Sequence, residues 1–111
     1  MTTHGEGWCF ITEAGHDPAT GEVPDAPGEQ TRLAIGKIVE RLADAEMTLD
    51  DVILVSTYTT DPSYAPEIDA AMRESFSGPM PAAGPLLVVG LVDPRLKVEF
   101  HVTARRGARR R

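Results

Sequence analysis

The chain offers only two amphipathic helices to cover the strands that its sequence predicts. Apolar residues at helical spacing predict one helix over residues 29–45 and a second from an N-cap at Asp61 or Ser63 to the neighbourhood of Gly78. Two helices cover only one face of a sheet, so the other face has to be buried by something else. Self-association is the simplest cover.

Four segments are rich in strand-forming residues: 8–12, 52–60, 86–92 and 96–104. The β-branched content and the length of 52–60 predict a central strand that is largely buried on both faces. Segments 86–92 and 96–104 are expected to form a closing β-hairpin or adjacent strands. The predicted fold class is therefore α/β (α+β), a mixed β-sheet with two helices packed on one face.

Residues 96–104 alternate between apolar and polar side chains. Successive side chains of a strand point to opposite faces. One face therefore carries Leu96, Val98, Phe100 and Val102, and the other carries Lys97, Glu99, His101 and Thr103. The polar face is the more informative one for function.

The 111 residues, 41% of them hydrophobic, suit one domain with one modest core. We expect this domain to span residues 1–104, followed by a basic tail at 105–111 that is solvated and disordered. Five of the 11 basic residues lie in the tail, so without them the net charge of −6 becomes about −11 for residues 1–104. Such an acidic body repels phosphate backbones, which leaves nucleic-acid binding without support outside the tail.

Sequence features of membrane, metal and cofactor proteins are missing. No run approaches the ~20 apolar residues of a membrane span, and the first residues do not resemble a signal peptide, so we expect a soluble, cytoplasmic protein. Cys9 is the only cysteine, which excludes a cysteine-based zinc site within one chain. On the first strand we expect it to be a buried apolar thiol; a nucleophile, the alternative, would need a neighbouring cation, and the sequence shows none. The only Gly-x-Gly, at residues 5–7, lacks the later glycine of a phosphate loop. We predict neither a metal nor a cofactor.

Four strings of the sequence carry a family resemblance: DPATGEV, EQTRLAIGKIVERLADAEMTLDDV, VSTYTTD and KVEFHVTA. Together with the order of the predicted elements, they resemble the reactive-intermediate deaminase (Rid, YjgF-like) family from residue 8 to about residue 104. The resemblance implies a chorismate-mutase-like sheet with two helices and a homotrimer whose ligand pockets lie between neighbouring subunits. It also implies hydrolysis of enamines and imines from amino-acid metabolism to keto acids and ammonia.

The chain departs from the family where the substrate carboxylate is held. The family motif Pro-Ala-Arg-Ser supplies an arginine that forms a bidentate pair with that carboxylate. Here the string reads Pro-Ala-Ala-Gly at 81–84, and either Ala83 or Gly84 takes the place of the arginine. Neither residue can replace a guanidinium.

The other expected site residues match the family in part. Glu99 falls where the family keeps a glutamate that is thought to position or activate water, and His101 occupies a place that is commonly a second glutamate. Asp69 takes a position that is often asparagine near the pocket. The family's Ser-Gly-Gln loop corresponds to the segment that contains Thr12 and Glu13.

Each of these side chains also has an interpretation that involves neither catalysis nor ligand binding. Glu99 and His101 suit a general base or a pair that positions water, or else a hydrated polar pair in the channel of a trimer. Glu13 and Asp69 could each contact a cationic ligand, or each could be an ordinary surface residue. If both lie close to Glu99, the pocket is expected to prefer a cationic or neutral ligand. Tyr58 is expected as a core or interface anchor, with a pocket wall as the alternative.

Two classes of function remain open. In the first, a divergent member of the family acts on a small reactive intermediate of a specialised pathway, by hydrolysis of a C=N bond or a related proton transfer. In the second, a non-catalytic trimer binds a small molecule or a partner in the same cleft. The retained Glu99 favours the enzyme.

Overall fold

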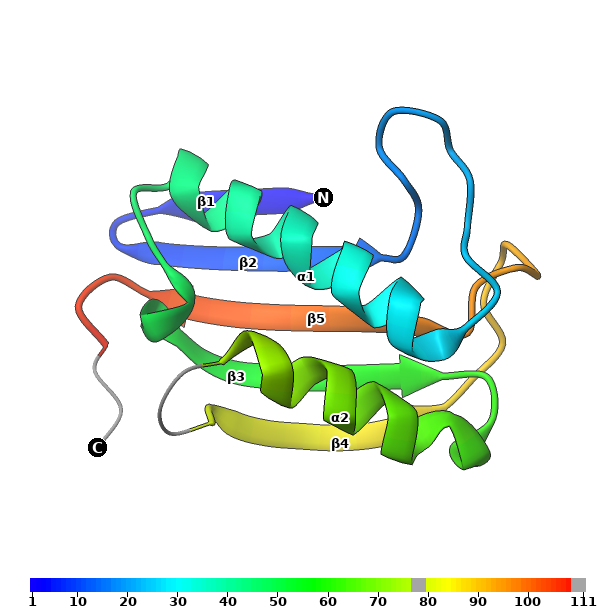
Figure 1. Ribbon diagram of the computed structural model, residues 1–111. Coiled ribbons are helices and arrows are strands. Elements are labelled where there is room, and N and C mark those ends of the chain that lie inside the picture. Colours follow the sequence, from blue (N-terminus) through cyan, green and yellow to red (C-terminus); the bar gives the residue numbers. More distant parts are fainter. Residues whose placement is uncertain (77–79, 109–111) are drawn as a thin grey trace.

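The computed structural model describes residues 1–76 and 80–108. Its one sheet has five strands in the order β1-β2-β5-β3-β4, and two helices lie against one face of it (Figure 1). The elements in chain order are β1 Thr2–Gly5, β2 Trp8–Ala14, α1 Pro27–Asp44, β3 Val52–Thr59, α2 Ala65–Ser75, β4 Ala82–Val88 and β5 Val98–Arg105. Short 3₁₀ helices, Leu49–Asp51 and Pro62–Tyr64, precede β3 and α2.

The strand pairing confirms the mixed sheet and corrects two expectations about its order. The pair β3–β4 is parallel, whereas β1–β2, β2–β5 and β3–β5 are antiparallel. Segment 52–60, as β3, is an inner strand with a neighbour on each side, but the middle strand of the sheet is β5. Its expected burial on both faces is wrong, because Leu54 is 38% exposed. The expected closing hairpin of 86–92 with 96–104 is also wrong, because β3 lies between β4 and β5. A parallel pair needs a crossover, and α2 supplies it between β3 and β4.

Strand β4 begins earlier in the sequence than expected. The predicted strand starts at residue 86, but β4 spans Ala82–Val88 and contains Pro85. An edge strand tolerates proline because one row of its N–H groups has no partner. The register of β4 against β3 shifts between Val55 and Thr57, next to this proline. Helix α2 ends at Ser75, and the predicted end near Gly78 lies outside the described residues.

The first hairpin was not predicted. Strands β1 and β2 are joined by Glu6 and Gly7, whose φ angles are 52° and 83°. Positive φ at both central residues is the requirement of a type I′ turn, the two-residue turn that matches the twist of a hairpin. The Gly-x-Gly at residues 5–7 is therefore a turn signal.

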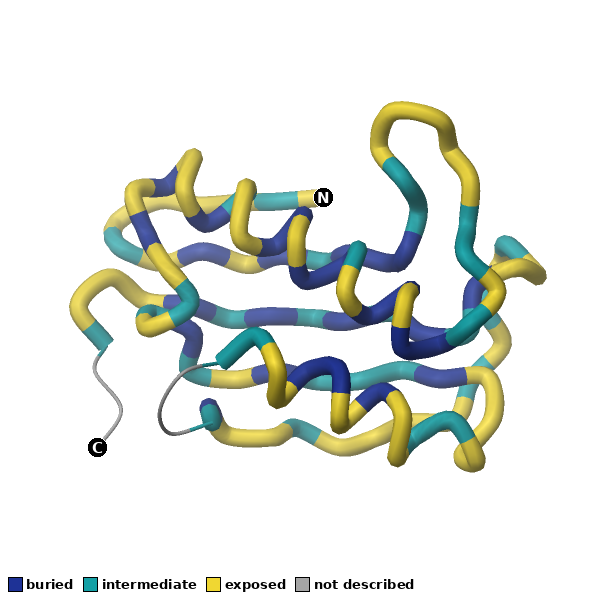
Figure 2. Tube along the Cα trace, viewed as in Figure 1, coloured by how far each residue is buried: buried dark blue, intermediate teal, exposed yellow. Residues whose placement is uncertain are grey.

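The hydrophobic core lies between the sheet and the two helices. Figure 2 shows dark blue positions alternating along β2 and β5. These buried residues form one cluster with apolar residues of α1 and α2. Val98, Phe100 and Val102 are buried there, which confirms the predicted alternation of the last strand. The opposite face of the sheet carries no helix, as Figure 1 shows. No helix within the described ranges is long and apolar enough to cross a membrane.

A buried glutamine ties the helix layer to two loops. The Gln30 side chain is fully buried, and its Nε2 donates to the carbonyl oxygens of Pro24 at 2.8 Å and Arg95 at 3.0 Å. Its Oε1 accepts from the backbone N–H of Lys97 at 2.8 Å. These three bonds connect the loop before α1 to the segment that leads into β5.

The start of the basic tail contacts the domain. Arg105 belongs to β5, and its guanidinium lies 5.2 Å from the ring centre of Trp8. Arg106 donates from Nη2 to the carbonyl oxygen of Ala45 at 2.6 Å, at the end of α1. We had expected the tail to be solvated from residue 105 onward; these two arginines instead form part of the folded surface.

Candidate functional site

The uncovered face of the sheet gathers several expected site residues into neighbouring rows. Directly opposed residues of antiparallel strands share a face. The register Thr12↔His101↔Ser56 therefore forms one row across β2, β5 and β3, and Ala14↔Glu99↔Tyr58 forms the next. Thr12, Glu99 and His101 thus lie together, and the alternation of the last strand had predicted the shared face of Glu99 and His101.

The centre of these rows is a contact between an imidazole and a carboxylate. His101 Nε2 lies 2.9 Å from Glu99 Oε2, and the two side chains keep 41% and 33% of their surface exposed. The Tyr58 ring lies against the imidazole, with ring centres 4.3 Å apart and planes inclined by 44°. His101 is therefore held between a ring and a carboxylate, while both polar groups still reach solvent. Such a pair can orient water and move a proton.

Position 84 needs glycine because the neighbouring strand comes very close. A Cβ on Gly84 would lie 2.3 Å from Ser56 Oγ and 3.1 Å from Ser56 Cβ. Ser56 is the residue that pairs with His101, so Gly84 borders the same row. No side chain fits at position 84 without displacement of Ser56.

Ala83 lies on the other side of the sheet. It pairs with Val55, which is buried beneath the helices, and both line a pocket together with Asp69 of α2. Asp69 is paired with Arg73 across this pocket wall. Of the two candidates for the position of the missing arginine, Ala83 faces the helix side, and Gly84 packs against Ser56 and also lines this pocket.

Glu13 is not available as a ligand contact. Its side chain is 9% exposed and lies between β2 and α1, where its oxygens are 3.2 Å from Lys37 Nζ and 3.4 Å from Arg41 Nε. The N-terminal amine of Met1 lies 3.3 Å from it as well. The structure supports neither prediction for Glu13, a pocket carboxylate or a surface position. Helix α1 covers this part of β2 and places two cationic side chains beside the buried carboxylate.

The three carboxylates that we considered together do not converge within one subunit. Glu13 is buried under α1, Asp69 is exposed on α2, and Glu99 lies on the uncovered face. Glu13 and Asp69 are paired with cationic side chains, and Glu99 contacts the imidazole of His101. The condition for a pocket that prefers a cationic or neutral ligand is therefore not met within one subunit.

Sequence reasoning missed Ser56 and Arg73 as neighbours of the expected site residues. Ser56 is placed by the register of β3 against β5, and Arg73 by the side of α2 that faces β4. The helical spacing of Asp69 and Arg73 was the available signal for their pairing. Cys9 is buried, as predicted, and burial raises the pKa of its thiol. No group of three or more His, Cys, Asp or Glu suited to a metal ion occurs in the described ranges.

Comparison with known sequences gives one family. Residues 7–106 match the family model described as endoribonuclease L-PSP. An uncharacterized protein of Streptomyces coelicolor is 32% identical over 82 residues, which cover 74% of this chain and 61% of that protein. The matched part therefore spans less than two thirds of this relative.

Solved structures share the fold. TdcF of E. coli with bound serine has a TM-score of 0.88 at 20% identity, over 96% of this chain and 86% of that one. RidA from the Antarctic bacterium Psychrobacter sp. PAMC 21119 has a TM-score of 0.87 at 21% identity, over 94% and 85%. A protein of unknown function from Pseudomonas aeruginosa is 28% identical, with a TM-score of 0.82 over 93% and 78%. With the match over residues 7–106, these likenesses make the chain a member of the endoribonuclease L-PSP family, the family of the YjgF and Rid proteins.

Proposed function

We propose that this protein hydrolyses small imines that lack a carboxylate, in clefts formed when three copies associate through the uncovered face of the sheet. The observation that carries the proposal is the contact between Glu99 and His101 at 2.9 Å on that face. Both side chains are partly exposed and lie in rows that also hold Thr12 and Ser56, which supply further hydroxyl groups. Family membership favours the same chemistry.

The reaction needs a water molecule and a group that takes its proton. Glu99 accepts a proton from water while the water oxygen bonds to the imine carbon, and the electron pair of the C=N bond takes up a proton at nitrogen. In the resulting carbinolamine the hydroxyl proton passes through Glu99 to the amine nitrogen, and the C–N bond then breaks, so that ammonia leaves and a carbonyl group remains. His101 positions the carboxylate through its Nε2 contact and exchanges protons with it.

Association is supported by apolar side chains on the uncovered face. Trp8, Phe10, Leu54 and Leu87 are 38%, 52%, 38% and 40% exposed. By the pairing of the strands they lie on the face that neither helix covers. Patches of this kind mark association surfaces, and a closed ring of three copies buries them without leaving an open end.

The preference against carboxylates follows from the missing guanidinium. Gly84 has no side chain and no room for one beside Ser56. Ala83 faces the helix side of β4. These rows hold no guanidinium, and the carboxylate of Glu99 would repel the carboxylate of an amino-acid imine.

The test compares imines with and without a carboxylate. An amine oxidase and an amino-acid oxidase generate the two kinds, and their decay is followed with and without the protein. We expect clear acceleration for the uncharged imines and little for the carboxylate-bearing ones. Glu99→Gln should lower the rate at least about 100-fold, whereas Glu40→Gln, an exposed glutamate of α1, should leave it unchanged. Acceleration that survives Glu99→Gln contradicts the proposed role of this residue.

The second candidate is a non-catalytic trimer that binds an uncharged small molecule in the same clefts. The close packing of Gly84 on Ser56 favours it, because it removes the family's means of holding a charged substrate. The two candidates separate in one measurement. Ligand binding with no turnover of any imine, and no effect of Glu99→Gln on that binding, supports the binding protein.

A further inference from the structure

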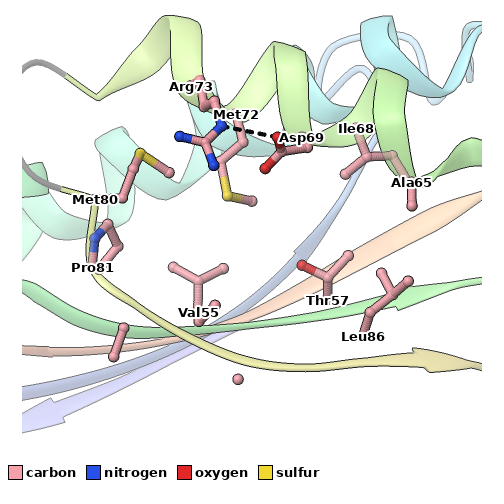
Figure 3. Close-up of a pocket in the computed structure, with 13 residues that line it drawn as sticks. Val55, Thr57, Ala65, Ile68, Asp69, Met72, Arg73, Met80, Pro81 and Leu86 are labelled. Atoms are coloured by element: carbon pink, nitrogen blue, oxygen red, sulfur yellow. Dashed lines mark hydrogen bonds and ion pairs between the residues drawn. The ribbon is translucent and has the colours of Figure 1, made fainter.

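The pairing of the strands brings Ser56 of β3 beside the contact between Glu99 and His101. Ser56 lies directly opposite His101 in the antiparallel register of β3 and β5. In Figure 3, Val55 and Thr57 point from β3 toward α2, on the helix side of the sheet. Successive side chains of a strand alternate, so Ser56, between them, points to the uncovered face. The hydroxyl group, the imidazole and the carboxylate therefore share one side of the sheet.

The three side chains stand in the order hydroxyl, imidazole, carboxylate. The Cβ atoms of directly opposed residues lie ~4.5–5.5 Å apart, which places Ser56 next to the ring of His101. On that ring, Nε2 lies 2.9 Å from Glu99 Oε2. When a neutral imidazole donates from Nε2 to a carboxylate, its Nδ1 carries the lone pair and can accept a proton. Nδ1 is also the ring nitrogen nearer the backbone, which suits the short side chain of a serine.

The edge strand is irregular opposite Ser56. The register of β4 against β3 shifts between Val55 and Thr57, so that Ser56 alone faces both Gly84 and Pro85. Bulges of this kind are common next to active sites, where they change the direction of a side chain. The Cβ that Gly84 lacks would lie 2.3 Å from Ser56 Oγ. A side chain at position 84 would therefore cover the serine oxygen, and glycine leaves it open.

We propose that Ser56, His101 and Glu99 form a hydroxyl–imidazole–carboxylate triad that hydrolyses small activated esters, such as the acetate esters of phenols. A nucleophile beside a base that a third group orients is the arrangement required for covalent acyl transfer. In the structure the serine oxygen lies on the side of Gly84. Rotation about χ1 to another staggered position brings it to the imidazole, and catalytic hydrogen bonds of this kind often form only with substrate bound.

The reaction has two stages and one covalent intermediate. Ser56 Oγ bonds to the carbonyl carbon of the ester while its proton passes to His101 Nδ1, and Glu99 stabilises the imidazolium. The bond from carbon to the phenol oxygen then breaks, and the phenol leaves with the proton of Nδ1. In the second stage a water oxygen bonds to the acyl carbon and its proton passes to Nδ1. The bond to Ser56 Oγ breaks, the serine recovers a proton from Nδ1, and a carboxylic acid leaves.

The inference goes beyond the proposed function, because it adds a nucleophile and a covalent intermediate to the pair of Glu99 and His101. All three residues belong to one chain, so their arrangement does not depend on the association of three copies. The imidazole and the carboxylate keep 41% and 33% of their surface exposed, which leaves them accessible to an ester. The three side chains supply a nucleophile and a base but no donors for the developing oxyanion. We therefore limit the substrates to esters with a good leaving group.

The experiment combines a chromogenic ester with a covalent probe on the full chain. Hydrolysis of p-nitrophenyl acetate is followed by absorbance, and a fluorophosphonate labels the nucleophilic serine, which peptide mass spectrometry then locates. We expect the label on Ser56 and ester hydrolysis that Ser56→Ala lowers at least about tenfold. His101→Gln should slow both reactions to a similar extent. Ser63→Ala, the same change at an exposed serine of the 3₁₀ helix before α2, is the matched control and should leave both unchanged.

A further variant tests Glu99 as the residue that positions the imidazole. Glu99→Gln should slow labelling of Ser56 at least about tenfold, because an amide does not stabilise the imidazolium. Its midpoint of thermal unfolding should stay close to that of the natural chain, since the carboxylate is partly exposed. A purely structural role of Glu99 would change the unfolding midpoint and leave the labelling rate of the folded protein unchanged.

Three results would overturn the inference: no label on Ser56, ester hydrolysis that survives Ser56→Ala, or labelling that His101→Gln leaves at the natural rate. Ser56→Ala removes a single oxygen atom, so thermal unfolding should show that this variant folds. Failure of the imine assay with intact labelling of Ser56 contradicts only the proposed function. Imine hydrolysis by a chain whose Ser56 takes no label contradicts only the triad.

Discussion

Two glutamates on neighbouring strands show how differently the two faces of the sheet treat a charge. Glu13 of β2 faces the helices, is 9% exposed and lies within 3.4 Å of two cationic side chains. Glu99 of β5 faces away from the helices, is 33% exposed and contacts one histidine. Burial among fixed cations makes the first carboxylate a structural part of the helix–sheet contact. Partial exposure leaves the second free to meet water, which is why we place the chemistry on the uncovered face.

The largest effect is expected from a charge placed in the middle of the uncovered face. Leu54→Arg would bury a guanidinium without a partner if three copies meet there, at a cost of several kcal/mol for each subunit. We expect light scattering to give three times the 12.0 kDa subunit mass for the natural chain and a single subunit mass for the variant. Val39→Arg is the matched control, since Val39 of α1 is 43% exposed and Leu54 is 38% exposed.

The same experiment can show that the uncovered face is not an association surface. A natural chain that elutes at 12.0 kDa would mean that the uncovered face stays in water. A Leu54→Arg variant that still associates would move the interface elsewhere. Val39→Arg should change neither mass nor thermal stability by much, because its side chain stays in solvent on the helix.

The next largest effect separates the two glutamates directly. Glu13→Gln should lower the free energy of unfolding by about 3 kcal/mol, because it leaves the buried Lys37 ammonium, 10% exposed, without its closest carboxylate. Glu99→Gln should lower it by less than about 1 kcal/mol, since exposed pairs contribute little. Urea unfolding at one protein concentration, in the associated and the monomeric background, measures both. Equal losses for the two variants would contradict the division of roles between the faces.

A buried neutral side chain, Gln30, tests whether burial among fixed partners makes a polar group structural when no charge is involved. Gln30→Ala removes three hydrogen bonds and leaves the backbone N–H of Lys97 without its acceptor, which should cost about 2 kcal/mol. Glu29→Ala, one residue earlier at an exposed position of α1, should cost less than about 0.5 kcal/mol. Urea unfolding again gives the values. A small loss for Gln30→Ala would mean that water replaces the missing amide.

The fold was largely predictable where local patterns decide it. The alternation of residues 96–104 assigned Phe100 and Glu99 to opposite faces before any partner strand was known. Strand β4 was misplaced because Pro85 is a loop signal in isolation, and only its position at the sheet edge makes a proline acceptable there. The order of β3, β4 and β5 likewise depends on the crossover through α2, which no local pattern encodes.

The candidate site was predictable only in part, because local sequence patterns do not specify which distant segments pack together. Two-residue spacing on one strand brought Glu99 and His101 together. The fate of Glu13 depended on which helix lies over β2, and the partner of His101 on β3 depended on register. Both are relations between distant segments. The missing guanidinium was readable from the sequence, whereas the steric reason for Gly84 required the distance to Ser56.

The smallest expected effect is a change in the solvent accessibility of two adjacent residues of β2, one on each face of the sheet. Trp8 is 38% exposed on the uncovered face, and Cys9 is fully buried on the other. Burial raises the pKa of the Cys9 thiol, and thiolate is the reactive form. Alkylation of Cys9 by iodoacetamide should therefore be at least about tenfold slower in the folded protein than in urea, in both the natural chain and Leu54→Arg. Acrylamide quenching of Trp8, the only tryptophan, should instead rise in Leu54→Arg, because dissociation uncovers its face. If quenching of Trp8 and alkylation of Cys9 change together, the variant has loosened the whole domain, and the two faces are not independent.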